Sequence, residues 1–151
     1  MAADRPAPEA RVLIADDNPQ GVELLEAYLG DTGYEVATAF DGEETLQKVR
    51  DWRPDLVLLD IMMPKLSGFE VCKRLKADPA TRGVAVLMIT ALDQPSDVDR
   101  AVDAGTDDFL TKPINQTDLL RRVSALLASR RKSGELEQAL AYMEAVERRE
   151  P

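Results

Sequence analysis

Short apolar runs alternate with longer amphipathic segments along the chain. The runs lie at residues 12–15, 34–39, 56–59, 84–90 and 108–111. Runs 56–59 and 84–90 are apolar on both faces, as in strands of a parallel sheet that helices cover on both sides. Run 34–39 alternates apolar and polar residues, which is typical of a strand near the edge of a sheet.

The amphipathic segments carry apolar residues at helical spacing, such as Val22, Leu25 and Leu29 in the first segment. Asp41 is placed to cap the second of the predicted helices, with Glu44 at the third helical position. Because strands and helices alternate, the chain is predicted to form a doubly wound α/β domain with a five-stranded parallel sheet.

The length of 151 residues leaves room for about one domain. Residues 1–10 contain two prolines and no periodic pattern, which predicts a flexible leader. The domain is expected at residues 11–129, followed at 130–151 by a helical extension that acts as a linker or in dimerisation. In that extension Leu136, Leu140 and Met143 fall at i, i+4 and i+7 and form a narrow apolar seam.

Charge and composition exclude several classes of function. With 19 basic and 28 acidic residues the chain carries a net charge of −9, which disfavours nucleic acid or a membrane as a direct partner. The chain has no histidine, which excludes Ser-His-Asp catalysis and a phosphohistidine carrier role. The single cysteine, Cys72, forms no internal disulfide and is expected in the core, in agreement with a cytoplasmic protein. Five cations lie near the expected end of the fifth helix, where they interact favourably with the macrodipole: Arg121, Arg122, Arg130, Arg131 and Lys132. A nucleic-acid patch is the less favoured interpretation of these residues.

Polar residues follow the predicted strands at the points where the strands end. They are Asp16 and Asp17, Asp60, Thr90 and Lys112. Because the carboxyl ends of parallel strands meet at one edge of a sheet, these side chains are expected to converge there. Crowded carboxylates require a cation, and oxygen ligands suit Mg²⁺. A carboxylate is also a nucleophile toward phosphorus, so the pattern predicts a phosphoryl-transfer site in which Asp60 attacks and Lys112 neutralises charge.

Four stretches of the sequence carry a resemblance to a known family. They are Ile14-Ala-Asp-Asp-Asn18, Leu59-Asp-Ile-Met-Met-Pro64 with Gly68, Ile89-Thr-Ala91 and Phe109-Leu-Thr-Lys-Pro113. With these motifs the chain resembles the receiver domain of two-component response regulators, from about residue 11 to residue 128. The resemblance implies a flavodoxin-like sheet with the strand order 2-1-3-4-5.

The same resemblance implies a role for the acidic residues. Asp60 is the phosphoacceptor, which takes a phosphoryl group from a sensor histidine kinase or a phosphotransfer protein. Mg²⁺ is the cofactor, held by Asp17, Asp60 and the backbone carbonyl of Met62, with Asp16 acting through water. The residues two positions after Asp60 and Thr90, which are Met62 and Leu92, line the path of the hydrolytic water.

Further roles implied by the resemblance concern the phosphoryl group and the switch. Lys112 binds the phosphoryl group, and the bond between Lys112 and Pro113 is cis. Thr90 moves inward on phosphorylation and Phe109 follows it, whereas Ala91 leaves room for the phosphodonor. Phe109 lacks the hydroxyl of the tyrosine that many receivers carry, so its switching rests on packing alone. Active receivers commonly pair through the fourth helix, fifth strand and fifth helix, which implies a homodimer.

Two other functions are consistent with an α/β sheet of this kind. A metal-dependent phosphatase needs a second carboxylate two residues after its nucleophile, but position 62 is methionine. A degenerate receiver that only binds proteins is disfavoured because all five active positions are filled. We therefore expect a phosphorylation switch that catalyses only its own phosphoryl transfer and slow dephosphorylation, either alone or as part of a longer regulator.

Overall fold

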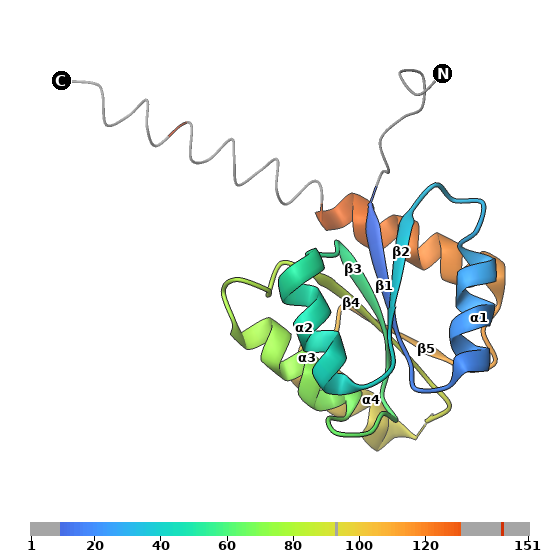
Figure 1. The fold of residues 1–151 in the computed structure, drawn as a ribbon. Coiled ribbons are helices and arrows are strands. Elements are labelled where there is room, and N and C mark those ends of the chain that lie inside the picture. The colour runs from blue at the N-terminus through green and yellow to red at the C-terminus, as the bar shows by residue number, and fades with distance from the viewer. Residues whose placement is uncertain (1–9, 93, 131–142, 144–151) are drawn as a thin grey trace.

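The computed structural model describes residues 10–92, 94–130 and 143. Five parallel strands form a sheet in the order β2-β1-β3-β4-β5 (Figure 1). The strands are β1 (Arg11–Ala15), β2 (Glu35–Ala39), β3 (Leu56–Asp60), β4 (Ala85–Thr90) and β5 (Asp108–Thr111). The predicted fold class and strand order are confirmed.

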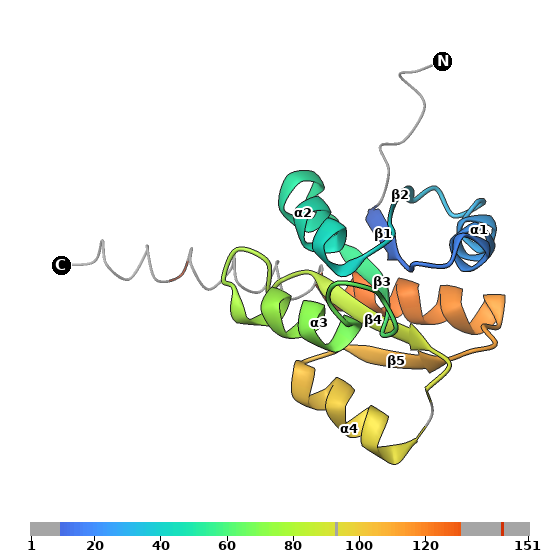
Figure 2. The same ribbon diagram turned by 60° about the horizontal axis from the view of Figure 1, so that its bottom comes forward.

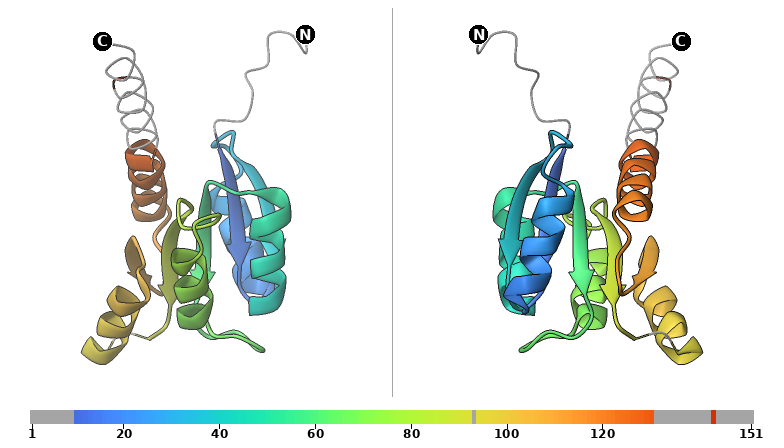
Figure 3. Two further views of the ribbon diagram at one scale, coloured as in Figure 1. Left: turned by 90° about the vertical axis from the view of Figure 1, so that its left-hand side faces the viewer. Right: turned by 90° about the vertical axis from the view of Figure 1, so that its right-hand side faces the viewer.

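Helices cover both faces of the sheet. They are α1 (Pro19–Tyr28), α2 (Gly42–Trp52), α3 (Gly68–Ala77), α4 (Pro95–Ala104) and a last helix that covers residues 116–130. Figure 2 shows α1 and the last helix on one face, with α2, α3 and α4 on the other, and Figure 3 shows the same layers from the two sides. None of the helices in the described part of the chain is long and apolar enough to cross a membrane.

Alternate residues of the central strands contribute to two separate apolar cores, one on each face of the sheet. Leu13 and Val57 pack with α2, α3 and α4, whereas Ile14 and Leu58 pack with α1 and the last helix. All five residues of β3 are buried, in agreement with a strand covered on both sides. The edge strand β2 buries only Ala39 fully, as its alternating pattern predicts.

The start of α2 is capped as the sequence predicts. Asp41 Oδ1 accepts a hydrogen bond from the Glu44 N–H at 2.7 Å, and Glu44 Oε1 accepts one from the Phe40 N–H at 2.6 Å. The Thr45 hydroxyl donates to the Asp41 carbonyl at 2.7 Å. The Asp41 side chain thus satisfies a backbone donor that the helix otherwise leaves free, and the Glu44 side chain binds the amide just before the cap, so the first turn of α2 is firmly held.

The ends of the predicted domain differ slightly in the structure. Ala10 is buried, and its carbonyl accepts a hydrogen bond from the Glu35 N–H at 2.9 Å, so the folded unit includes a residue assigned to the leader. Residues 1–9 of the predicted leader lie outside the described residues. The same holds for residues 131–142 and 144–151 of the predicted extension.

Two arginines of the last helix form ion pairs with other elements. Arg122 Nη1 lies 2.8 Å from Asp108 Oδ2 at the start of β5. Arg130 Nη1 lies 2.7 Å from Asp55 Oδ1, and its Nε donates to the Gly83 carbonyl at 2.8 Å. These arginines therefore bind carboxylates and a loop carbonyl, partners that the sequence did not predict.

Cys72 is predicted to resist modification while the protein is folded. Its side chain is fully buried on α3, and burial raises the pKa of its thiol to about 11. Because the thiolate is the reactive form, we expect the thiol reagent DTNB to react only as fast as the domain opens. Absorbance of the released thiolate, followed with and without urea, measures this; rapid reaction of fully folded protein would contradict it.

Candidate functional site

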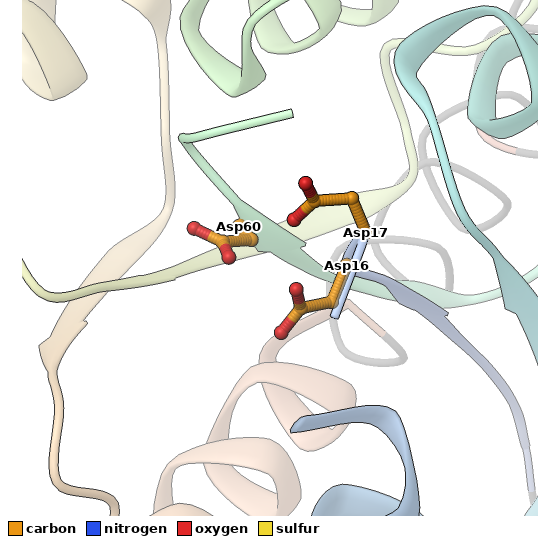
Figure 4. A group of neighbouring side chains, drawn as sticks. All are labelled: Asp16, Asp17 and Asp60. Atoms are coloured by element: carbon orange, nitrogen blue, oxygen red, sulfur yellow. The ribbon is translucent and has the colours of Figure 1, made fainter. Parts of the chain in front are cut away.

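Three carboxylates meet at the carboxyl edge of the sheet. Asp16, Asp17 and Asp60 each offer an oxygen within 4.8 Å of the others (Figure 4). The register explains the meeting, because Ala15 of β1 pairs with Leu59 of β3 and an aspartate follows each of them, Asp16 just beyond β1 and Asp60 at the end of β3. Asp16 and Asp60 are 2% and 7% exposed, whereas Asp17 is exposed.

Lys112, which follows β5, supplies a positive charge to this cluster. Its Nζ lies 3.3 Å from Asp60 Oδ2 and 3.5 Å from Asp16 Oδ2. Its backbone N–H donates to the Thr90 carbonyl at 2.8 Å, which fixes the start of the lysine beside the end of β4. The Lys112–Pro113 peptide bond is cis, as the resemblance implies. Since one ammonium faces three carboxylates, the cluster retains negative charge that a divalent cation would neutralise.

The electrostatic environment shifts the pKa values of both partners. Burial raises the pKa of Asp60 to about 6, and the nearby charge of Asp16 acts in the same direction. Hydrogen bonding from the Met62 N–H and the charge of Lys112 oppose these effects. Partial burial lowers the pKa of Lys112, but the carboxylates of Asp60 and Asp16 outweigh it and hold the value above normal. Lys112 is therefore a permanent cation at neutral pH.

Backbone amides orient the two buried carboxylates. Asp16 Oδ1 accepts a hydrogen bond from the Asn18 N–H at 3.0 Å, and Asp60 Oδ1 accepts one from the Met62 N–H at 3.1 Å. Gly21, in the first turn of α1, also contacts Asp16, since a Cβ there would lie 2.6 Å from Asp16 Oδ2. Sequence reasoning missed Gly21, although a glycine inside a helix is unfavourable enough to signal a close approach.

The predicted switch residues lie beside this cluster. Thr90 ends β4 and is fully buried, and its hydroxyl accepts a hydrogen bond from the Leu92 N–H at 3.3 Å. Ala91 is exposed, and Phe109 is half-buried against the core beneath α2, α3 and α4. The movements assigned to Thr90 and Phe109, and the access assigned to Ala91, stay predictions.

A cavity that the sequence did not predict opens next to Lys112. Its volume is about 370 Å³. Leu24 and Tyr28 of α1 form one wall, and Pro113 and Ile114 form the other. The cavity is mainly apolar, and Asp16 and Lys112 also line it.

Residues 12–124 match the family described as the response regulator receiver domain, and the chain belongs to this family. It is 48% identical over 117 residues to the response regulator PleD of Caulobacter vibrioides, covering 78% of this chain and 26% of PleD. It is 42% identical over 134 residues to RpaA of Synechocystis, a DNA-binding transcriptional regulator, covering 89% of this chain and 54% of RpaA. The chain thus spans between about a quarter and about half of these curated relatives.

Solved structures agree with this assignment. A receiver domain of a histidine kinase from Syntrophus aciditrophicus is similar with a TM-score of 0.75 and 36% identity, over 80% of this chain and 91% of that one. A receiver domain protein from Methanospirillum hungatei is similar with a TM-score of 0.76 and 28% identity, over 82% and 97%. The family predicted from the four motifs is confirmed, which favours a receiver over the phosphatase alternative.

Proposed function

We propose that the chain is a phosphorylation switch in which Asp60 accepts a phosphoryl group from a histidine kinase or a phosphotransfer protein. The observation that carries this is the cluster of Asp16, Asp17 and Asp60 within 4.8 Å, with Lys112 Nζ 3.3 Å from Asp60. In this function the chain acts in the cytoplasm and turns over no separate substrate. It catalyses only its own phosphorylation and slow dephosphorylation.

Asp16, Asp17, Asp60 and the Met62 carbonyl would hold Mg²⁺. The donors fit this ion because all of them are oxygens and the carboxylate cluster carries more charge than Lys112 neutralises. When bound, Mg²⁺ neutralises charge on the phosphoryl oxygens and on the attacking carboxylate.

The residues of the chain position and neutralise the reacting groups. An Asp60 carboxylate oxygen forms a bond to phosphorus as the P–N bond of the phosphohistidine breaks. The electron pair of that bond returns to an imidazole ring protonated at its other nitrogen, so neutral imidazole leaves. Lys112 pairs with a phosphoryl oxygen, and the Thr90 hydroxyl donates to another in the product. The apolar cavity beside Lys112 supports docking of a protein phosphodonor along α1.

Labelling by acetyl phosphate tests this function without a cognate kinase. We expect the intact mass to rise by a single phosphoryl group when Mg²⁺ is present and to stay unchanged in EDTA. Calorimetry with Mg²⁺ alone should show binding to the unphosphorylated chain. A chain that binds Mg²⁺ and is never labelled would contradict the proposal.

Phosphorylation is further proposed to favour a homodimer through α4, β5 and the last helix. Val98 and Val102 lie one turn apart on α4 and are 40% and 66% exposed. The exposed acid Asp103 lies on α4, and the exposed base Arg121 lies on the last helix. Two copies related by a twofold axis can therefore pair apolar with apolar and acid with base.

Sedimentation with and without beryllofluoride and Mg²⁺ is expected to show a mainly monomeric chain that dimerises on activation. Val102→Asp should weaken the activated dimer about tenfold or more, roughly 1.4 kcal/mol, because it places a charge in an apolar contact. Labelling by acetyl phosphate should persist in this variant. A chain ending at Ser129 tests the extension: an unchanged dimerisation constant would show that residues 130–151 act only as a linker.

A further inference from the structure

The loop between β3 and α3, residues 61–67, presents the Met62 carbonyl that would bind Mg²⁺. The loop folds back on itself, since the Gly68 N–H donates to the Ile61 carbonyl at 2.8 Å and the Leu66 N–H donates to the Pro64 carbonyl at 2.8 Å. Lys65 has a φ of 71°, which is uncommon for a residue other than glycine. A loop in such a conformation persists only if its surroundings hold it there.

The first turn of α2 provides such contacts. The Gly42 N–H donates to the Pro64 carbonyl at 3.4 Å. A Cβ at position 42 would lie 2.5 Å from both the Cβ and the carbonyl oxygen of Leu66, so only glycine allows this approach. Lys65 Nζ lies 3.4 Å from Asp41 Oδ2, the carboxylate that caps α2.

Of the two parts in contact, the loop is the more exposed. The first turn of α2 is held by its capping bonds, and Thr45 and Leu46 are buried at the start of the helix. In the loop, by contrast, Met62 is 62% exposed and Lys65 is exposed. A methyl group at position 42 would therefore displace the loop rather than the helix.

We infer that Gly42 is a positioning residue for the metal site: by seating Leu66 against α2 it holds the loop in the shape that presents the Met62 carbonyl. This inference rests on the proposed function. Gly42 itself supplies no ligand, so its effect reaches the metal only through the loop. Residues that orient metal ligands in this indirect way typically change metal affinity by about 10- to 100-fold when substituted.

The test compares Gly42→Ala with Gly83→Ala, where a Cβ would meet nothing within 4 Å. For Gly42→Ala we expect the dissociation constant for Mg²⁺, measured by calorimetry, to rise roughly tenfold. Gly83→Ala should match the parent chain. At saturating Mg²⁺ the acetyl phosphate labelling rate of Gly42→Ala should return close to the parent value, because Asp60 and Lys112 are unchanged. If Gly42 had only a structural role, Gly42→Ala would lower the melting temperature and leave the dissociation constant for Mg²⁺ unchanged. An unchanged dissociation constant would therefore overturn the inference.

A measurement on the parent chain covers the case in which Gly42→Ala does not fold. If Gly42 stabilises the metal-binding shape of the loop, Mg²⁺ must stabilise the contact at Gly42 in return. Saturating Mg²⁺ should therefore slow hydrogen exchange of the Gly42 amide by a larger factor than exchange of the Arg53 amide at the other end of α2. Unaltered exchange at Gly42 in Mg²⁺-bound protein would overturn the inference and leave the proposed function intact. A parent chain that binds no Mg²⁺ would overturn both.

Discussion

Asparagine at position 60 is expected to abolish labelling by acetyl phosphate. The amide has nearly the shape of the carboxylate and can still accept the hydrogen bond that Asp60 Oδ1 takes from the Met62 N–H at 3.1 Å. It lacks the charged oxygen that attacks phosphorus, so the site is kept and the nucleophile is lost. Intact mass after incubation with acetyl phosphate and Mg²⁺ measures the result. Asp51→Asn, an exposed change of the same kind on α2, should label like the parent chain.

The same substitution is expected to stabilise the domain when Mg²⁺ is removed. Asp60 is 7% exposed and shares its site with Asp16 and Asp17, against the single ammonium of Lys112. Burial raises the pKa of Asp60 to about 6, which means that the charged form destabilises the folded state at neutral pH. Removing this charge should raise the free energy of unfolding by about 2 kcal/mol, measured by urea unfolding in EDTA.

Two outcomes would contradict this account of Asp60. Undiminished labelling of Asp60→Asn would place the phosphoryl group on another residue. Lower stability of Asp60→Asn in EDTA would show that the three carboxylates do not repel one another in the folded chain. Mg²⁺ should also raise the melting temperature of the parent chain more than that of the variant, because the variant lacks a charged ligand.

The candidate site could be predicted because it depends on where strands end. Asp16, Asp60 and Thr90 each close an apolar run, and the structure places them at the carboxyl edge of the sheet. Parallel strands carry such ends to one edge of the sheet whatever their order, so local patterns predicted the edge at which these residues lie. The order itself came from the resemblance to receivers, since periodicity does not determine which strands pair.

Contacts between distant segments could not be predicted in this way. Arg130 pairs with Asp55, which lies 75 positions earlier in the chain. Gly42, at the start of α2, contacts Leu66 of the β3–α3 loop. Hydrophobic periodicity indicates which face of a helix or strand is buried. It does not indicate which residue of another element a polar or small side chain contacts. Gly42 lies between Asp41 and Glu44, so the sequence pattern predicted its place at the helix cap. The pattern did not predict its contact with the β3–α3 loop.

The phosphorylated state is expected to be long-lived, and two polar substitutions should shorten it. The Met62 N–H donates to Asp60 Oδ1 and the Leu92 N–H donates to the Thr90 hydroxyl, so both residues adjoin the phosphoryl site. Their apolar side chains cannot orient a water molecule for attack on the acyl phosphate. Met62→Asn or Leu92→Gln supplies an amide for that purpose and should speed decay roughly tenfold, which corresponds to about 1.4 kcal/mol of the barrier.

A desalting column first removes the acetyl phosphate, both free and bound to Mg²⁺. Decay is then measured by following the intact mass with time. Met62→Leu is the matched control, because it changes the shape of the side chain without adding a hydrogen-bonding group. Faster decay in Met62→Leu as well would indicate that the shape of the side chain, and not an added hydrogen-bonding group, sets the decay rate. If Met62→Asn and Leu92→Gln decay as slowly as the parent chain, the water reaches phosphorus by a path that these side chains do not border. Met62 and Leu92 would then not determine the lifetime of the phosphorylated state.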